Sequence, residues 1–324
     1  MIRKKTTLIL GAGASKYFGY PIGEELFKKI LEICSNKSPE YKILELFTKS
    51  DHEINNFREV LLNSGKCSID EFLEYRKEYD LIGKCAISLA LIPFESHHKL
   101  FNGGSNENWY KYLFKIMNTD CTVDTFPSNQ ISFITFNYDR SLEHFLFTSI
   151  KNSFQDMDDE KCAQIMKNFP IIHLHGTLGS LPYINNDIQK EFESVDYNPE
   201  FSKFQNGISY RAYSPTTDYN IIKDCNQNLK IIHDNQDNRI LESATDLLQD
   251  SDRIYFLGFG YNSKSLSRLN ISKLSPNKII AGTAFGMGKI EISKVSSDTN
   301  DLIKVRKLYN CGIVEFFKNY ESLS

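Results

Sequence analysis

The chain has 324 residues, of which 41% are hydrophobic and 24% charged, and its formal net charge is −3. This is the composition of an ordinary globular protein, long enough for one large domain or two smaller ones. Because the net charge is not positive, the chain has no overall electrostatic attraction for nucleic acid, and direct nucleic-acid binding is not expected. The first five residues lead straight into a predicted strand without a secretory segment, and no apolar run is long enough to span a membrane. These features predict a cytoplasmic protein.

The seven cysteines are odd in number, and no two of them are spaced as CxxC. This pattern disfavours both a disulfide framework and a structural zinc ribbon. The pair His97-His98 has no cysteine nearby and no HExxH pattern around it. We therefore predict no metal site.

The first predicted element is a strand that runs directly into a glycine-rich turn. Thr6 to Leu10 is a β-branched and apolar run, typical of a buried strand. Gly11-Ala12-Gly13-Ala14-Ser15 follows at once, and its two glycines permit a sharp turn and a close approach to a ligand. A helix that opened there would direct its free N–H groups at a phosphate. The pattern is GxGxS rather than GxGxxG, so a tight strand-to-helix turn without a ligand is the alternative.

The next part of the chain has helical periodicity. Residues 24–34 place Leu26, Ile30 and Ile33 on one face of a helix. Spacings near 3.6 then recur from about 40 to 118, and we interpret residues 39–124 as a helical insertion in the first nucleotide-binding unit.

Further short apolar strands are predicted along the remaining chain, each followed by a loop with Gly, Asn or His-Gly. They cover residues 131–136, 171–174, 253–257 and 278–281, with helices predicted at 141–150 and 238–250. Residues 181–238 are polar and weakly periodic, which indicates loops or a small irregular subdomain. A terminal helix at 299–309 and a strand at 312–316 would complete the sheet.

This alternation predicts an α/β fold, a Rossmann-like parallel sheet with helices on both faces. We expect one domain over residues 1–324, with the sheet built from 1–38, 125–180 and 239–324. In open parallel sheets, ligands bind at the carboxyl ends of the strands, near the topological switch point. The strand-end loops would gather on that edge, and this convergence predicts a nucleotide site.

Several strand-end motifs follow one another in the order of a known family. GAGAS at 11–15, TFNYD at 135–139 and HLHG at 173–176 resemble the SIR2 family, specifically the bacterial SIR2-like NAD-cleaving proteins of antiphage defence. LGFG at 257–260 is similar to the family's later glycine motif, beside a ribose. The chain lacks the four-cysteine zinc ribbon of deacylating sirtuins, and residues 16–23 lack their arginine-containing sequence. The resemblance therefore implies cleavage of the nicotinamide–ribose bond of NAD+ with water as acceptor.

The two predicted catalytic residues are His175 and Asn137. Histidine suits the role of base or water-positioning group at neutral pH, and its loop position gives the His175 ring access to a ligand. The amide of Asn137 can donate and accept hydrogen bonds, and so can orient the attacking water or a ribose hydroxyl. The alternatives are a strand-end histidine and a turn-closing asparagine. His173 is interpreted as a packed core histidine.

The predicted binding residues flank this pair. Asp139 either holds the nicotinamide carboxamide or caps the following helix, and the sequence leaves the two equal. Ser15 is predicted to contact a phosphate, with a helix cap as the alternative. Gly258 and Gly260 would lie beside the ribose, and Thr283 would face the adenosine side. Together with Gly11-Ala12-Gly13 these residues form the predicted NAD+ site.

The resemblance implies an NAD+ glycohydrolase that releases nicotinamide and ADP-ribose and depletes NAD+ in antiphage defence by abortive infection. One alternative is a module that binds NAD+ or ADP-ribose and regulates a partner without turnover; a less favoured one is an NAD-dependent protein deacylase. Because an always-active enzyme would poison its cell, the resemblance implies control by homo-oligomerisation or by a separately encoded defence partner. Residues 181–238 and the helical insertion are candidate contact surfaces.

Overall fold

A six-stranded sheet forms the centre of the protein, in a computed structural model that describes residues 1–48, 50–102, 107–185, 187–190, 202–205, 208–231 and 238–323. Its strand order is β3-β2-β1-β6-β7-β8, and every neighbouring pair is parallel. The strands are β1 (Thr6–Leu10), β2 (Ile131–Thr135), β3 (Ile171–His173), β6 (Arg253–Leu257), β7 (Ile279–Thr283) and β8 (Leu308–Tyr309). Numbered within this sheet, the order is 3-2-1-4-5-6, that of doubly wound nucleotide-binding folds. The predicted Rossmann-like α/β class is confirmed.

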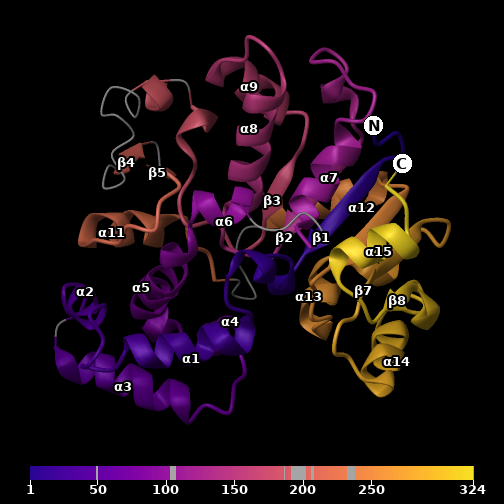
Figure 1. The fold of residues 1–324 in the computed structure, drawn as a ribbon. Helices are drawn as coiled ribbons and strands as arrows, with labels where there is room; N and C mark the ends of the chain where they lie inside the picture. Colours follow the sequence, from indigo (N-terminus) through magenta and orange to yellow (C-terminus); the bar gives the residue numbers. More distant parts are fainter. Residues whose placement is uncertain are drawn as a thin grey trace.

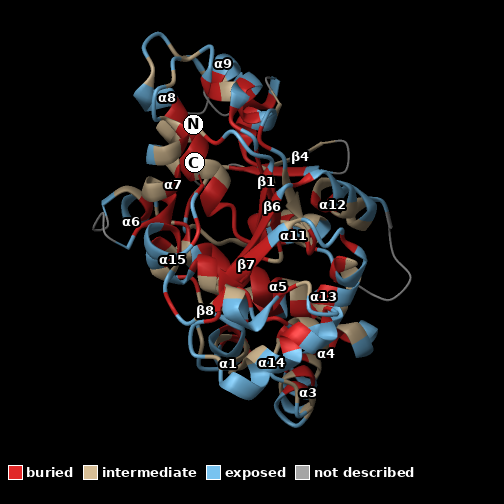
Figure 2. Ribbon diagram, turned by 90° about the vertical axis from the view of Figure 1, so that its right-hand side faces the viewer, coloured by how far each residue is buried: buried red, intermediate tan, exposed pale blue. Residues whose placement is uncertain are grey.

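Helices cover both faces of this sheet (Figure 1). In β1, Leu8 and Leu10 face a core shared with α1, α5, α7 and α8, whereas Ile9 faces the core that contains residues of α12, α13 and α14. This arrangement explains why the strands are continuous apolar segments in the sequence, because a strand buried on both faces has no polar side. Figure 2 shows β1, β6 and β7 as the buried centre of the molecule.

The helices occur in three groups along the chain. The first runs from β1 to β2 and comprises α1 (Gly23–Ile33), α2 (Tyr41–Glu45), α3 (Asp51–Leu62), α4 (Ile69–Tyr75), α5 (Asp80–Leu91), α6 (His97–Asn102) and α7 (Trp109–Met117). The others are α8 (Ser141–Ser153), α9 (Asp159–Met166) and α11 (Tyr219–Asn228), and then α12 (Asn238–Asp250), α13 (Ser263–Arg268), α14 (Lys289–Asp298) and α15 (Ile313–Asn319). Over the ranges described, none of them is both long and apolar enough to cross a membrane.

The helical character predicted for residues 40–118 is confirmed, and this block packs on the sheet rather than apart from it. Its helices α5 and α7 bury residues in the same core as β1 and β2. The indole of Trp109 at the start of α7 donates a hydrogen bond to the carbonyl of Ala14 over 2.8 Å. The insertion therefore supports the first glycine-rich loop directly.

Residues 181–238 are partly described, since 186, 191–201, 206–207 and 232–237 lie outside the described residues. The described part contains a two-stranded antiparallel pair, β4 (Ser202–Gln205) with β5 (Ile208–Arg211), as well as α11. Helix α11 packs on α5 of the insertion, with Ile221 and Ile222 fully buried. The two segments between sheet strands thus share one core.

The helix predicted at 299–309 and the strand predicted at 312–316 are wrong. Asn300 and Asp301 have positive φ angles of 53° and 59°, which end a helix, and the sixth strand is the two-residue β8. The apolar residues that follow form α15, in which the adjacent Phe316 and Phe317 are both buried. A short apolar run does not by itself distinguish a strand from a helix.

Candidate functional site

The loops after β1 and β6 meet at the point where the strand order reverses. Gly11 N–H donates to the carbonyl of Leu257 over 3.1 Å, and Gly13 N–H donates to the carbonyl of Gly258 over 2.9 Å. In folds with this strand order, ligands bind in the crevice at this switch point. The predicted loop therefore stands at the position expected for a dinucleotide site.

The glycines of these two loops allow backbone to pack on backbone. A Cβ on Gly11 would lie 2.6 Å from the carbonyl oxygen of Gly258, and one on Gly258, whose φ is +57°, would lie 2.1 Å from the nitrogen of Ala14. Larger side chains would force the loops apart, so contact between the loops accounts for both glycines without a ligand.

The first loop does not open an α-helix. It forms two 3-10 turns, Ala12–Ala14 and Lys16–Phe18, and α1 begins only at Gly23. The N–H groups of Ala14 and Ser15 donate to Gly11 and Ala12 within the loop, as those of Gly11 and Gly13 do to the second loop. Most of the amides that were expected to face a phosphate therefore have protein partners.

Asn137 and Ser15 join the first loop to the end of β2. The side-chain amide of Asn137 donates to the carbonyl of Gly11 over 2.9 Å and to Ser15 Oγ over 3.1 Å. Ser15 Oγ donates in turn to Asp139 Oδ2 over 2.7 Å. Within the described part of the chain, the side-chain oxygen of Asn137 accepts no hydrogen bond, so it remains able to accept one from water or a hydroxyl.

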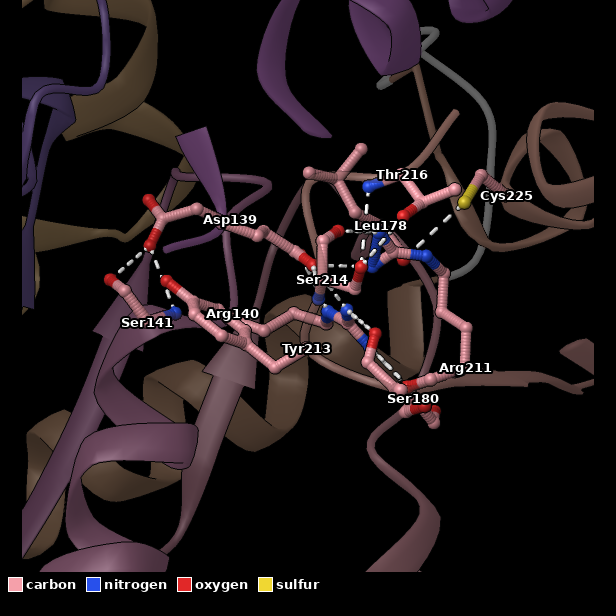
Figure 3. Close-up of polar contacts among 12 residues, drawn as sticks. Asp139, Arg140, Ser141, Leu178, Ser180, Arg211, Tyr213, Ser214, Thr216 and Cys225 are labelled. Carbon is pink, nitrogen blue, oxygen red and sulfur yellow. Dashed lines mark hydrogen bonds and ion pairs between the residues drawn. The ribbon is translucent and has the colours of Figure 1, made fainter. Parts of the chain in front are cut away.

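Asp139 uses its carboxylate on neighbouring groups of the protein. Its Oδ1 accepts hydrogen bonds from the backbone N–H of Ser141, over 3.1 Å, and from the Ser141 hydroxyl (Figure 3). Burial raises the pKa of Asp139, and the hydrogen bonds from Ser141 and Ser15 only partly offset this. These contacts are those expected if Asp139 caps the start of α8. The other predicted role of Asp139, binding the nicotinamide carboxamide, stays a prediction.

His175 and Asn137 each come two residues after the end of one of two neighbouring strands. The last residues of β2 and β3, Thr135 and His173, are paired, and Leu174 N–H donates to the carbonyl of Thr135 over 2.9 Å. The rings of Phe136 and Tyr138 flank the His175 ring, each with its centroid 5.6 Å away. Asn137 and His175 are each 9% exposed, so both side chains are largely buried.

Asp70, in the first turn of α4, faces His175 and was not predicted from the sequence. Its Oδ1 lies 3.5 Å from Nδ1 of His175 and also accepts a hydrogen bond from the Tyr138 hydroxyl. Burial raises the pKa of Asp70, but the contacts with His175 and Tyr138 outweigh it and hold the pKa below its usual value. The one sequence feature near Asp70 is the capping pattern Ser68-x-x-Glu71 before an apolar run. This pattern predicts where the helix starts, but it does not predict that Asp70 contacts His175.

His173, interpreted from the sequence as a packed core histidine, is only partly buried, and it belongs to an ion pair. Its Nδ1 lies 3.0 Å from the carbonyl oxygen of Asn137, and its Nε2 lies 2.5 Å from Oε1 of Glu143. Burial lowers the pKa of His173, but the carboxylate of Glu143 raises it further, so the net pKa is above the usual value. Both ring nitrogens face acceptors, so a protonated ring would donate to Glu143 and to the backbone of Asn137.

A cavity of about 530 Å³ lies beside the edge strand β3. His173, Glu143, Thr177 and Lys230 contribute to its polar lining, and apolar side chains such as Ile171 line the rest. Neither Asn137 nor His175 lines it. The cavity thus lies next to the strand-end pair but does not contain it.

The predicted binding residues after β6 and β7 are held mainly through the backbone. Gly258 N–H donates to Thr283 Oγ1 over 2.9 Å, and Thr283 is 3% exposed. Gly260 is exposed, and a Cβ built on it would meet nothing within 4 Å. The structure therefore brings Gly258 and Thr283 together with the first loop, but shows no contact that would require a glycine at 260.

A buried ion cluster lies behind Asp139 and connects three parts of the chain (Figure 3). Glu95 accepts hydrogen bonds from Arg140 over 2.7 and 2.9 Å and from Arg211 over 2.5 Å, and all three side chains are at most 1% exposed. The remaining guanidinium contacts include the carbonyls of Ala212 and Ser214. The cluster thus joins the insertion, the start of α8 and the β4–β5 segment.

The chain matches no known protein-family model, and no curated protein is significantly similar to it. Within the described ranges, no three His, Cys, Asp or Glu side chains gather as a metal site. The site is thus defined by its strand-end residues and by Asp70.

Proposed function

We propose that this protein is an NAD+ glycohydrolase. The observation that carries the proposal is that Asn137 and His175 follow the ends of adjacent parallel strands, and that Asn137 binds the glycine loop at the switch point. That edge is where folds of this type bind dinucleotides. The order of the strand-end motifs, similar to that of SIR2-like NAD-cleaving proteins, supports the same activity.

In the proposed reaction, water attacks the ribose carbon that bears nicotinamide. The N-glycosidic bond breaks and its electron pair stays on the ring nitrogen, so nicotinamide leaves as a neutral molecule. His175 takes the proton of the attacking water, and the side-chain oxygen of Asn137 accepts a hydrogen bond that orients this water or a ribose hydroxyl. The products are nicotinamide, ADP-ribose and one proton.

The biological role that we propose is depletion of NAD+ in antiphage defence. Such an activity requires restraint, which we assign to homo-oligomerisation or to a separately encoded partner that senses infection. The candidate contact surfaces are the helical insertion and the described parts of residues 181–238, which pack on each other through α5 and α11.

The test is the release of nicotinamide from NAD+ by the purified protein, measured with and without the products of neighbouring genes. We expect Asn137→Ala and His175→Ala each to lower turnover by roughly 10²-fold or more, because each removes a group at the reacting centre. The exposed Asn55→Ala and His98→Ala are the matched controls and should leave turnover unchanged. Full turnover in both site variants would refute the proposal.

A regulatory module that binds NAD+ or ADP-ribose without turnover is the second candidate. It is favoured by one observation: the side-chain N–H groups of Asn137 are engaged within the protein, so this residue has only its side-chain oxygen to offer a reacting group. Calorimetric binding of either nucleotide, combined with no nicotinamide release under any condition, would support it over the enzyme.

A further inference from the structure

We propose that Asp70 is a positioning residue for His175, which the helical insertion supplies to a site otherwise built from strand ends. The proposal rests on the proposed function, in which His175 is the base. Its basis is geometric: Oδ1 of Asp70 lies 3.5 Å from Nδ1 of His175, and the same oxygen accepts the hydroxyl hydrogen of Tyr138. One carboxylate oxygen thus accepts a hydrogen bond from Tyr138 and faces a ring nitrogen of His175.

The charges of these three groups determine where the His175 proton lies. The pKa of Asp70 lies below its usual value, so this side chain is a carboxylate at neutral pH and can only accept hydrogen bonds. Burial raises the pKa of Tyr138 well above its usual value, so its hydroxyl keeps its proton and donates. A proton on Nδ1 of His175 would face this carboxylate, and Nε2 would then keep its lone pair.

This tautomer is the one that the proposed reaction needs. A free lone pair on Nε2 can take the proton of the attacking water, and the negative charge of Asp70 stabilises the imidazolium that results. A carboxylate that fixes the tautomer of a histidine base has this effect in hydrolytic triads. Asp70 would thus act on the rate of the chemical step through His175.

Helix α4 holds Asp70 in place at both of its ends. At the start, Ser68 Oγ accepts the N–H of Glu71 over 3.1 Å. At the other end, Glu74 pairs with Lys264 over 2.9 Å and with Arg268 over 2.7 Å, both on α13. Phe72 and Leu73 are buried between these ends. The helix therefore reaches from the ends of β2 and β3 to the helix that follows β6, and rigid support of this kind is what a positioning group requires.

The first experiment compares steady-state kinetics of Asp70→Asn, Asp70→Glu and Glu71→Gln. We expect Asp70→Asn to lower kcat at least roughly tenfold and by no more than the 10²–10⁴ that a general base supplies, with KM changed less than about twofold. Asp70→Glu should restore part of kcat. Glu71→Gln removes an equivalent charge from the same helix turn and should behave as the wild type. An Asp70→Asn variant as fast as the wild type, or faster, would overturn the proposal.

A second measurement is independent of activity. ¹⁵N NMR spectra of the imidazole nitrogens, assigned with His175→Ala, report which nitrogen carries the proton. We expect Nδ1–H in the wild type and loss of this preference in Asp70→Asn and, to a smaller extent, in Tyr138→Phe. The same tautomer in all three proteins would overturn the proposal. If the wild type releases no nicotinamide, the enzymatic function fails, and the spectra alone decide whether Asp70 positions His175.

Discussion

At the ends of β2 and β3, polar side chains bind one another, whereas at the ends of β6 and β7 the backbone makes most of the contacts. Asn137, Asp139 and His175 belong to networks that extend into the helical insertion. Gly258 instead packs its backbone on the first glycine loop, and Gly260 is exposed. Under the proposed function, the two halves of one sheet edge serve different purposes: the first carries the reactive groups, and the second forms the backbone surface beside them.

This difference also changes how a sequence motif is interpreted. The sequence predicts a close ligand at glycines 11, 13 and 258, yet each of these glycines is needed for contact between the two loops. The side-chain networks of the first half have no such simple explanation, because a buried Asn or Asp costs free energy unless its groups are paired. Polar residues at buried strand ends are therefore the stronger functional signal here.

We expect the largest effect on stability at the buried ion cluster of Glu95, Arg140 and Arg211, which adjoins the ends of β2 and β3. Glu95→Gln would leave the guanidinium groups of Arg140 and Arg211 buried without a counter-charge. We expect the free energy of unfolding to fall by about 3–5 kcal/mol, measured by urea denaturation. Glu24→Gln, which breaks an exposed pair with Lys28, is the control and should cost less than about 0.5 kcal/mol. Equal effects in the two variants would contradict this account of the cluster.

Two glycine variants test whether backbone packing requires glycine at the end of β6. Gly258→Ala forces a side chain into a positive φ angle and against the nitrogen of Ala14, so we expect a loss of at least about 1–3 kcal/mol. Gly260→Ala adds the same methyl group at an exposed position with nothing within 4 Å and should leave stability unchanged. Thermal unfolding of the two variants checks both expectations. If Gly260→Ala were the more damaging, the packing between the loops would not be what requires the glycine.

The ion pair between His173 and Glu143 predicts that the stability of the protein depends on pH. Because the pKa of His173 is raised in the folded protein, its stabilising effect is complete below about pH 6.5, the unfolded value, and is lost as pH rises through the folded pKa. His173→Gln should therefore cost about 1.5–3 kcal/mol at low pH and progressively less at higher pH. Denaturation of both proteins across this range measures the difference. A gap that widened with pH would show that the ring is not a buried imidazolium.

The smallest effect is expected at Thr283. Thr283→Val removes the oxygen that accepts the N–H of Gly258 while preserving the shape of the side chain. We expect a loss of about 1 kcal/mol and little change in kcat, because this contact supports the backbone surface and does not touch the proposed base. Stability and turnover measured on the same preparation separate the two effects. A large fall in kcat at full stability would assign Thr283 to the reactive half.

The sequence predicted the part of this structure that depends on local patterns. Strands β1, β2, β6 and β7, and the loops that follow them, were identified because buried parallel strands are continuous apolar runs that end in turn residues. Their convergence on one edge followed from the parallel fold. The role of Asp70 could not be predicted, because an acidic residue in a first helical turn is also favoured by the helix dipole alone. The prediction for the C-terminal region was wrong because β8 has two residues and α15 has seven. Elements this short do not show a clear strand or helix periodicity in the sequence.

The position of α4 between β1 and β2 in the chain has a consequence for shortened forms of this protein. A deletion of the helical insertion, residues 39–124, would spare every sheet strand and both glycine loops in the sequence. It would nevertheless remove part of the core of the sheet, the indole that supports Ala14 and the carboxylate that faces His175. Under the proposals made above, such a shortened protein would keep its sequence motifs and lose its chemistry.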